Sequence, residues 1–546
     1  MQSTMQDVQL QVRRLLEHGG TVHAGSEVVT MTAEGPRRAS FAEVARNAAR
    51  LAHALTELGV GEGDRVATFM WNNQEHVEAY FGVPCMGAVL HPLNIRLFPE
   101  QVVWIAEHAE DQVLIVDDTL VPVVAKLLPR MTSVRHVVVN SPGGPADLSA
   151  LEGVGPQVHE YRALLEGRSD TYDWPDVDER SAAAMCYSSG TTGDPKGVVY
   201  SHRSVYLHSM GISLPDVFDL SAADSVLVIV PQFHVLAWGL PYAAFLTGAT
   251  MAMPDRYLVP EPLAAFVVAA RPTKGAGVPT VWAGLLQYVG ANPAADISSL
   301  QEAVVGGAAC PPSLMDGYDA IGIRLVHAWG MTETSPLGCL ARPPVGVTDP
   351  EAVRRYRLAQ GRFVGPVEAR LVGVEGETVA WDGESVGELE VRGPWVTGTY
   401  YRDDDPAKFD DGWLRTGDVG SITPDGFLTL TDRMKDVIKS GGEWISSVEL
   451  ENHLMAHDAV VEASVVAVPD ERWGERPLAT VVLAEGAEAT PEELQQFLAG
   501  RVAKWQVPER WAFVDEVPKT SVGKFDKKAI RKRHAEGDLE VVTTGS

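Results

Sequence analysis

The stretch Tyr187–Gly197, YSSGTTGDPKG, gathers glycines, hydroxyl groups and a lysine in one short segment. It follows an apolar run, residues 182–186, that is typical of a strand. Its glycines would let backbone amides approach an anion closely, and Lys196 adds a point charge for a phosphate. Further donors would be Ser188, Ser189, Gly190, Thr191, Thr192 and Gly193. A Walker A loop differs, because its lysine precedes Ser or Thr. We therefore predict a phosphate-binding loop of another kind.

The whole chain is acidic and long enough for more than one domain. Its 546 residues exceed one ordinary core, and 45% hydrophobic with 22% charged residues is normal for a globular protein. With 73 acidic and 45 basic residues, the formal net charge is −28. Such a charge repels nucleic acid and anionic membranes at long range, so we expect no nucleic-acid partner.

The cysteines and the N-terminal segment bear on the compartment. The chain has only four cysteines, and none has metal-ligand spacing, which favours a reducing compartment. Residues 1–20 lack a continuous apolar segment, and no stretch approaches the length of a membrane span. We therefore expect a cytoplasmic protein with no integral membrane association.

Helices and strands are expected to alternate through the first half of the chain. Ser40 and Glu43 are typical of a helix N-terminus and precede apolar residues on one helical face. Residues 65–71 and 113–116 are typical of buried strands, which favours parallel α/β layers. From about residue 373 to 431, turn residues and alternating segments predict a β-rich region. Beyond it, the pattern indicates a small α+β domain.

Several further segments contain residues suited to nucleotide chemistry. The glycines of residues 305–309, VGGAA, would let a flat ring lie against the backbone. Residues 327–336, HAWGMTETSP, combine an aromatic ring that could stack, Trp329, with a carboxylate, Glu333. A second carboxylate, Asp418, lies within GWLRTGD. Each segment alone is also compatible with a turn or a helix start, so their joint presence and order carry the interpretation.

Together these segments closely resemble the adenylate-forming superfamily, which includes acyl-CoA synthetases, adenylation domains of peptide synthetases and beetle luciferases. The resemblance extends from about Thr21 to about Arg533. It is greatest to medium- and long-chain fatty acid–CoA ligases, through AWGMTETSP at residues 328–336 and KSGGEWISSVELE at residues 439–451.

The resemblance implies a nucleotide site with bound Mg²⁺. Besides the phosphate loop, the implied nucleotide contacts are Gly306, Gly307, Ala308, His327, Ala328, Trp329, Gly330, Met331, Asp418, Arg433 and Lys435. Glu333 and Ser188 would hold the metal ion, and Thr332 would contact the α-phosphate.

The resemblance also implies an acid pocket, formed by His234, Trp238, Gly307 and Trp444. His234, within VPQFHVLAW, is at the position of a gating ring near the acid. Gln232 departs from the apolar residue usual in that segment. Trp444 is at the position where long-chain relatives gate the acyl tunnel.

A two-step reaction follows from the resemblance, with ATP and coenzyme A as co-substrates. A small-molecule acid and ATP would form an acyl-adenylate, which then passes to the thiol of coenzyme A. Lys524 would bridge the acid and the phosphate in the first step. The catalytic set implied by the family is Lys524, Thr332, Glu333, Lys439 and His234.

The predicted fold class is α/β. A large N-terminal domain, residues 1–434, would contain layered α/β sheets and the β-rich subdomain. A small, mobile α+β C-terminal domain, residues 435–546, would rotate about a hinge near Lys435. A homodimer is expected by analogy with the relatives.

Other reactions remain open at this stage. The acid could be an aryl acid, or the enzyme could transfer the acyl group to an amine or activate another oxyanion such as nitrite. A light-emitting oxygenase has the same fold, without specific support here. A non-catalytic nucleotide-binding scaffold would be favoured by loss of Lys524, Glu333 or the glycine loop, and all of these are present.

Overall fold

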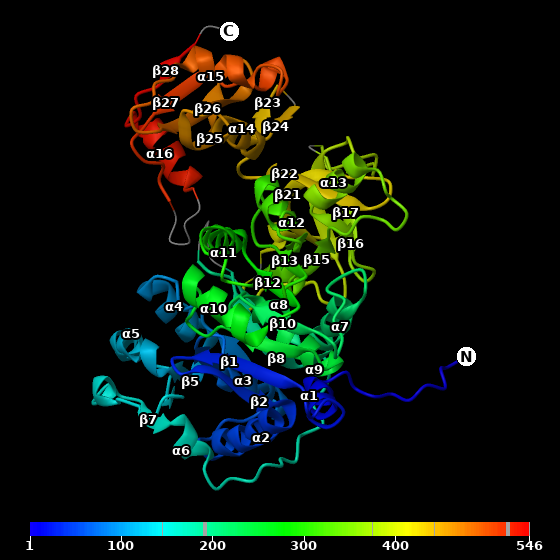
Figure 1. The fold of residues 1–546 in the computed structure, drawn as a ribbon, viewed down its shortest axis with the longest axis vertical. Coiled ribbons are helices and arrows are strands. Elements are labelled where there is room, and N and C mark those ends of the chain that lie inside the picture. The colour runs from blue at the N-terminus through cyan, green and yellow to red at the C-terminus, as the bar shows by residue number, and fades with distance from the viewer. Residues whose placement is uncertain are drawn as a thin grey trace. The chain divides into compact units, whose positions relative to one another are not determined.

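The structure is a computed structural model that describes residues 1–144, 146–188, 194–373, 375–403, 405–441, 443–519 and 525–544 (Figure 1). The chain divides into two compact units, which are described separately. Unit 1 contains residues 1–368 and 392–414, and unit 2 contains residues 369–391 and 415–546. The sequence predicts a domain boundary after residue 434 because a hinge is expected near Lys435. That boundary stays a prediction.

Unit 1 contains two sheets of mainly parallel strands. The first sheet has the order β7-β6-β5-β3-β4-β8-β9 and is parallel except for the β8/β9 pair. Its strands are β3 (Arg65–Phe69), β4 (Val89–Pro92), β5 (Asp111–Asp117), β6 (His136–Asn140), β7 (Gln157–Glu160), β8 (Ala182–Tyr187) and β9 (Gly197–Ser201).

The second sheet of unit 1 has the order β16-β15-β14-β13-β12-β10-β11-β1-β2. It is parallel from β1 through β14 and antiparallel at both ends. Its strands are β1 (Glu27–Thr32), β2 (Gly35–Ser40), β10 (Ser225–Val228), β11 (Thr250–Met253), β12 (Lys274–Gly277), β13 (Glu302–Val305), β14 (Arg324–Gly330), β15 (Leu337–Leu340) and β16 (Gly361–Phe363).

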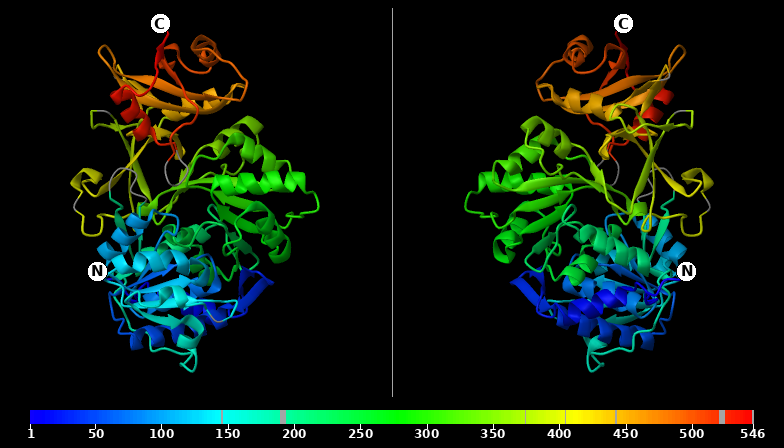
Figure 2. Two further views of the ribbon diagram at one scale, coloured as in Figure 1. Left: turned by 90° about the vertical axis from the view of Figure 1, so that its left-hand side faces the viewer. Right: turned by 90° about the vertical axis from the view of Figure 1, so that its right-hand side faces the viewer.

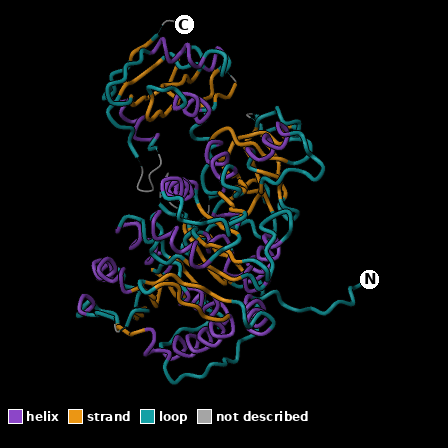
Figure 3. Tube along the Cα trace, viewed as in Figure 1, coloured by secondary structure: helices purple, strands orange, loops and turns teal. Residues whose placement is uncertain are grey.

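Helices flank and separate these sheets, as the purple and orange segments of Figure 3 show. Those of unit 1 are α1 (Val12–Thr21), α2 (Phe41–Glu57), α3 (Gln74–Cys85), α4 (Pro99–Ala109), α5 (Val121–Leu127), α6 (Tyr161–Leu165), α7 (His202–Ser213), α8 (Val235–Trp238), α9 (Leu240–Thr247), α10 (Pro260–Ala270), α11 (Pro279–Ala291), α12 (Pro312–Asp319) and α13 (Pro350–Leu358). Every residue of α3 is buried, because this helix contacts β1 of one sheet and β4 and β8 of the other.

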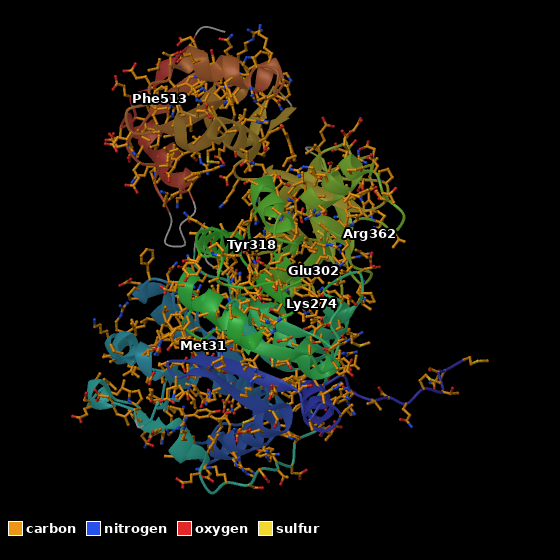
Figure 4. All side chains as sticks on the ribbon, in the orientation of Figure 1. Met31, Lys274, Glu302, Tyr318, Arg362 and Phe513 are labelled. Atoms are coloured by element: carbon orange, nitrogen blue, oxygen red, sulfur yellow. The ribbon has the colours of Figure 1, made fainter. Side chains whose placement is uncertain are left out.

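The outer faces of both sheets are covered by apolar helix faces. Helices α4 and α5 pack on the first sheet, and α10, α11 and α12 pack on the second. Trp282 of α11 is fully buried there, and the hydroxyl of Tyr318 on α12 donates to its backbone oxygen at 2.7 Å. At the start of the parallel strands, Lys274 pairs in register with Glu302, and both are labelled in Figure 4.

Unit 2 contains a β-rich part and a small α+β part. The first has the strand order β18-β17-β19-β21-β22, formed by β17 (Glu368–Val372), β18 (Thr378–Val379), β19 (Gly387–Arg392), β21 (Trp413–Ile422) and β22 (Phe427–Arg433), and β20 (Phe409–Asp410) pairs with β21. The second has the order β24-β23-β26-β27-β28, formed by β23 (Ile438–Ser440), β24 (Glu443–Ile445), β26 (Gly474–Leu483), β27 (Arg510–Phe513) and β28 (Val542–Thr543), with β25 (Val460–Asp470) on β26. Its helices are α14 (Ser447–Met455), α15 (Pro491–Leu498) and α16 (Lys527–Glu536).

The predicted fold class is confirmed, and so is much of its local basis. Parallel sheets layered with helices are visible in both views of Figure 2. Ser40 caps α2 by accepting a hydrogen bond from the backbone N–H of Glu43 at 3.2 Å, as the sequence predicts. All four cysteines are buried and free. No helix in the described part of the chain is both long and apolar enough to cross a membrane.

Candidate active site

The predicted phosphate loop joins two antiparallel strands, β8 and β9. Its described ends are tied together, because Lys196 N donates to Ser188 Oγ at 3.1 Å and Ser188 N donates to Lys196 O at 2.9 Å. Gly197 has no room for a side chain, since a Cβ atom there would lie 3.0 Å from the Tyr187 ring and 3.1 Å from Tyr401 Cβ. The intervening Ser189, Gly190, Thr191, Thr192 and Gly193 lie outside the described residues, as does Lys524. The position of Ser188 and Lys196 is compatible with phosphate binding.

Lys196 lies among two carboxylates and an aromatic ring. Its Nζ is 2.5 Å from Asp405 Oδ2 and 3.2 Å from Asp403 Oδ2, and it lies 4.9 Å from the centre of the Tyr400 ring. Partial burial opposes the ammonium charge, but these two acids outweigh it and raise the pKa of Lys196. The hydrogen bond from Lys196 lowers the pKa of Asp405 in turn. The lysine is therefore fully charged at neutral pH.

The predicted metal ligand Glu333 is held by the same segment. Its side chain is 6% exposed, and its Oε1 accepts a hydrogen bond from the Tyr400 hydroxyl at 2.8 Å. Its backbone oxygen accepts from Thr397 N at 2.8 Å, while the Tyr200 hydroxyl donates to Thr332 O at 2.8 Å. Burial, followed by the Glu333 carboxylate, raises the pKa of Tyr400, so this hydroxyl stays protonated and remains a donor. Tyr400 thus contacts both the predicted metal ligand and the predicted phosphate lysine.

The residues present fit a magnesium ion that arrives with a nucleotide. Across the described ranges, no three His, Cys, Asp or Glu side chains gather into a metal site. Mg²⁺ commonly binds through one or two protein carboxylates together with substrate phosphates and water. A single buried carboxylate such as Glu333 therefore suits this ion, provided that the triphosphate supplies further oxygens.

Gly306 and Trp238 meet at the end of β13. A Cβ atom at Gly306 would lie 3.2 Å from Ala328 O and 3.2 Å from the Trp238 ring, so only glycine leaves both in place. Gly307 and Ala308 follow and are exposed, and Gly307 has φ +78°. The predicted acid pocket and adenine loop therefore share this contact.

The segment that bears His234 has an unusual backbone. The sequence gives no sign of it, yet Val235, Leu236, Ala237 and Trp238 all have φ between 48° and 56°. They form a left-handed turn, α8, in place of an ordinary helix start. His234 itself is exposed, so it is accessible to a ligand.

Strand β14 carries the next group of predicted residues. His327 is buried, and its Nδ1 lies 3.0 Å from Ala359 O. Burial lowers the pKa of His327, which keeps the ring neutral. The Trp329 ring lies against Gly338, where a Cβ atom would come within 2.2 Å. Gly330 is equally restricted, because a Cβ atom there would meet a backbone oxygen at 1.8 Å.

The remaining predicted residues belong to unit 2. Asp418 on β21 is 2% exposed and pairs with Arg433 on β22, whose Nε is 2.6 Å from Asp418 Oδ1. Lys435 and Lys439 are exposed. Trp444 is half-buried opposite Lys439 in the β23/β24 hairpin, and its indole N–H has no hydrogen-bond partner among the described residues.

Two groups of residues near the site were not predicted. One is the segment of residues 394–405, whose Tyr400, Asp403 and Asp405 contact Lys196 or Glu333. The aromatic and acidic residues of GTYYRDDD were a signal, but nothing in the sequence connects them to the phosphate loop. Residues 394–402 of this segment also line a cavity of about 420 Å³, together with residues 198–201, Ser204 and Ser335.

The second group fixes the segment before His234. Asn72 Nδ2 donates to Val228 O and Val230 O, both at 2.8 Å, and Asn72 Oδ1 accepts from Gln232 N at 2.8 Å. Asn73 N donates to Gln232 Oε1 at 3.2 Å. Gln232, the departure from the apolar pattern, is thus fully buried and hydrogen-bonded to the first sheet's β3–α3 turn.

Comparison with known proteins defines the class. Residues 16–401 match the family of AMP-binding enzymes, and residues 449–524 match the AMP-binding enzyme C-terminal domain. The chain therefore belongs to the AMP-binding enzyme family, and the predicted superfamily is confirmed.

Individual relatives narrow the class further. The chain is 43% identical to a 3-methylmercaptopropionyl-CoA ligase of Ruegeria pomeroyi, over 96% of this chain and 97% of that one. It is 41% identical to a medium-chain-fatty-acid–CoA ligase of Ectopseudomonas oleovorans, over 98% of both. A solved anthranilate–CoA ligase with bound anthranoyl-AMP has a TM-score of 0.81 and 25% identity, over 98% of this chain and 100% of that chain. The predicted enzyme class, an AMP-forming acyl-CoA ligase, is confirmed.

Proposed function

We propose that this chain converts a medium- or long-chain carboxylic acid to its coenzyme A thioester through an acyl-adenylate. The observation that carries the proposal is the full-length match to acyl-CoA ligases, because it spans both family regions. The contacts of Tyr400 with Lys196 and Glu333 support it, since they bring together a cation that could bind a phosphate and a carboxylate that could bind its metal ion.

In the first step, a carboxylate oxygen of the acid attacks the α-phosphorus of ATP and pyrophosphate leaves. Both reactants are anions, so the protein has to compensate their charges. Lys196 and the Ser188 end of the phosphate loop would hold the leaving pyrophosphate, and Lys524 would bridge the acid and the α-phosphate. Thr332 would orient that phosphate.

Glu333 and Ser188 are the proposed protein ligands of Mg²⁺, which would neutralise phosphate charge when bound with ATP. The pair of Asp418 and Arg433 is suited to the ribose, because a carboxylate accepts both ribose hydroxyl protons while the guanidinium holds it in place. The loop of Gly306 and Gly307 would lie along the adenine.

In the second step, the thiol of coenzyme A attacks the acyl carbonyl and AMP leaves. The thiol proton is lost to solvent or to a base as the thioester forms. We propose that the C-terminal part rotates about Lys435, so that Lys524 leaves and the segment with Lys439 and Trp444 approaches the acyl group. We further propose a cytoplasmic location and a homodimer.

A panel of acids of graded length and aromaticity tests the proposal. Pyrophosphate and thioester are measured separately, with and without coenzyme A. We expect both products for straight-chain acids, and AMP release only when coenzyme A is present. Thioester from aryl acids alone would replace the fatty-acid proposal. An amide product would indicate a different acceptor, and activation of nitrite would indicate a different oxyanion substrate. Absence of AMP with every acid would contradict enzyme function of this kind.

The length preference is tested at Trp444. Its ring is half-buried, and its indole N–H lacks a partner in the described part of the chain, which suits a gate that a long acyl chain displaces. Trp444→Ala should flatten the preference among acids of different length by about tenfold while the Km for ATP is unchanged. An unchanged length profile would remove the gating role.

A further inference from the structure

The cation of the phosphate loop already has anionic partners within unit 1. Lys196 Nζ is 2.5 Å from Asp405 Oδ2 and 3.2 Å from Asp403 Oδ2. Asp405 is 209 positions away from the lysine in the sequence, and both acids lie on the segment that follows β19. The positive charge that a triphosphate would need is therefore already paired with two carboxylates.

A phosphate that approaches Lys196 meets this arrangement with an electrostatic cost. The ammonium group has three donors; it donates a hydrogen bond to Asp405 and forms an ion pair with Asp403. An incoming phosphate oxygen has to replace a carboxylate, or share the ammonium group with it at a distance where like charges repel. The affinity for the nucleotide is then reduced by the free energy of the pairs that break.

We propose that Asp403 and Asp405 are exchangeable counter-ions of Lys196, which the phosphates of ATP displace on binding and which recapture the lysine as pyrophosphate leaves. This inference rests on the proposed function, and it adds two residues to the reaction cycle. Their role is to limit how tightly pyrophosphate is held, since a lysine without a competing anion would retain the product.

The geometry allows such an exchange without unfolding the segment. Lys196, Asp403 and Asp405 are 32%, 40% and 30% exposed, so each side chain can turn into solvent without leaving a packed core. The backbone just before Asp403 stays in place.

Two contacts fix that backbone. Tyr401 N donates to Gly197 O at 2.8 Å, and Arg402 contacts both Glu110 carboxylate oxygens at 2.9 Å. The acids are thereby kept within reach of the lysine after they release it. The Tyr400 ring, which lies beside the ammonium group, gives it a contact that does not depend on either acid.

A double-mutant cycle on the full-length protein tests the exchange. The variants are Asp403→Asn with Asp405→Asn, Lys196→Ala, and all three together, and the probes are MgATP and magnesium pyrophosphate. We expect the two Asn substitutions to tighten MgATP binding about three- to tenfold and to slow pyrophosphate dissociation by a similar factor. In the Lys196→Ala background, the same substitutions should change both values less than twofold.

The control is Asp411→Asn, which removes a charge from the exposed turn between β20 and β21. This control separates counter-ion exchange from a general reduction of negative charge. Its affinity for MgATP should stay within twofold of the wild-type value. An equal gain with Asp411→Asn, or an equal gain with and without Lys196, would overturn the proposal. If the double variant fails to fold by circular dichroism, the single Asn variants are used in the same cycle.

The outcome also separates this inference from the proposed function. A wild-type protein that forms thioester, combined with a cycle that shows no coupling, would disprove the counter-ion exchange alone. A wild-type protein that releases no AMP with any acid would disprove the proposed function, whatever the binding cycle shows.

Discussion

Glu78 on α3 carries a pH-dependent part of the stability of unit 1. The side chain is 1% exposed. Burial, followed by the charge of Glu75, raises the pKa of Glu78 to about 7, although hydrogen bonds from Asn47, Tyr161 and Gln74 favour the ionised form. The pKa of an ordinary glutamate is 4.5. The folded protein therefore holds this proton more tightly than the unfolded chain does.

The sign and size of the effect follow from linkage. Below pH 4.5 both states are protonated, and the contribution of Glu78 to stability is fully present. Between pH 4.5 and about 7 the unfolded chain loses the proton that the folded chain keeps, so stability falls as the pH rises. A difference of about 2.5 pKa units corresponds to a loss on the order of 3 kcal/mol, constant above pH 8.

Glu78→Gln removes the titration while it keeps the volume. Three groups donate hydrogen bonds to the carboxyl group of Glu78, and the glutamine amide has one acceptor oxygen fewer. We therefore expect the variant to lose some stability by the same amount at every pH. Between pH 5 and pH 8 the free energy of unfolding of the variant should therefore gain about 2.5 kcal/mol relative to that of the wild type. Urea unfolding at several pH values measures it, and the exposed Glu166→Gln is the matched control. A difference that is independent of pH would refute the raised pKa.

Three further substitutions test the site. Tyr400→Phe keeps the ring but removes the hydroxyl that donates to Glu333. A hydrogen bond to a charged group contributes about 1.5–3 kcal/mol. The Mg²⁺ concentration that half-saturates pyrophosphate release should therefore rise about tenfold. An unaltered Mg²⁺ curve would exclude this orienting role. Gly306→Ala pushes the Trp238 ring, 3.2 Å from the new Cβ atom, so the Km for the acid should rise about three- to tenfold with a smaller change for ATP; equal changes in both Km values would contradict it. Lys524→Ala should abolish acid-dependent pyrophosphate release and spare thioester formation from supplied acyl-adenylate, and equal loss of both would remove its assigned role.

Local features of the fold could be predicted because their causes are local. Residues 65–71 were expected to form a strand and contain β3, Arg65–Phe69. Ser40 was expected to start a helix, and a hydroxyl three residues before a glutamate is enough to cap one. The phosphate loop rests on local residue types in the same way, within eleven positions of one another, and its role stays a prediction.

Contacts between distant segments could not be predicted from such patterns. Nothing near Asp405 indicates that it lies 2.5 Å from Lys196, because that contact depends on how β9 and the segment after β19 are brought together. Tyr400 was missed for the same reason, although it contacts two residues that the sequence did identify. Family motifs therefore predict which residues bind ligands, and those roles stay predictions, whereas the residues that contact them were visible only in the structure.

The left-handed turn before Gly239 is the clearest case in which packing overrides local preference. A residue with a Cβ atom costs roughly 1–2 kcal/mol in this region, and Val235, being β-branched, is especially unfavourable there. Nonetheless Val235, Leu236, Ala237 and Trp238 all adopt it and are at most 7% exposed. Such strain persists only where the surroundings determine the conformation, here the hydrogen bonds of Gln232 on one side and the Trp238–Gly306 contact on the other. The turn is thus held at both ends by residues beside the proposed acid pocket, which places the strain where a fixed pocket wall is needed.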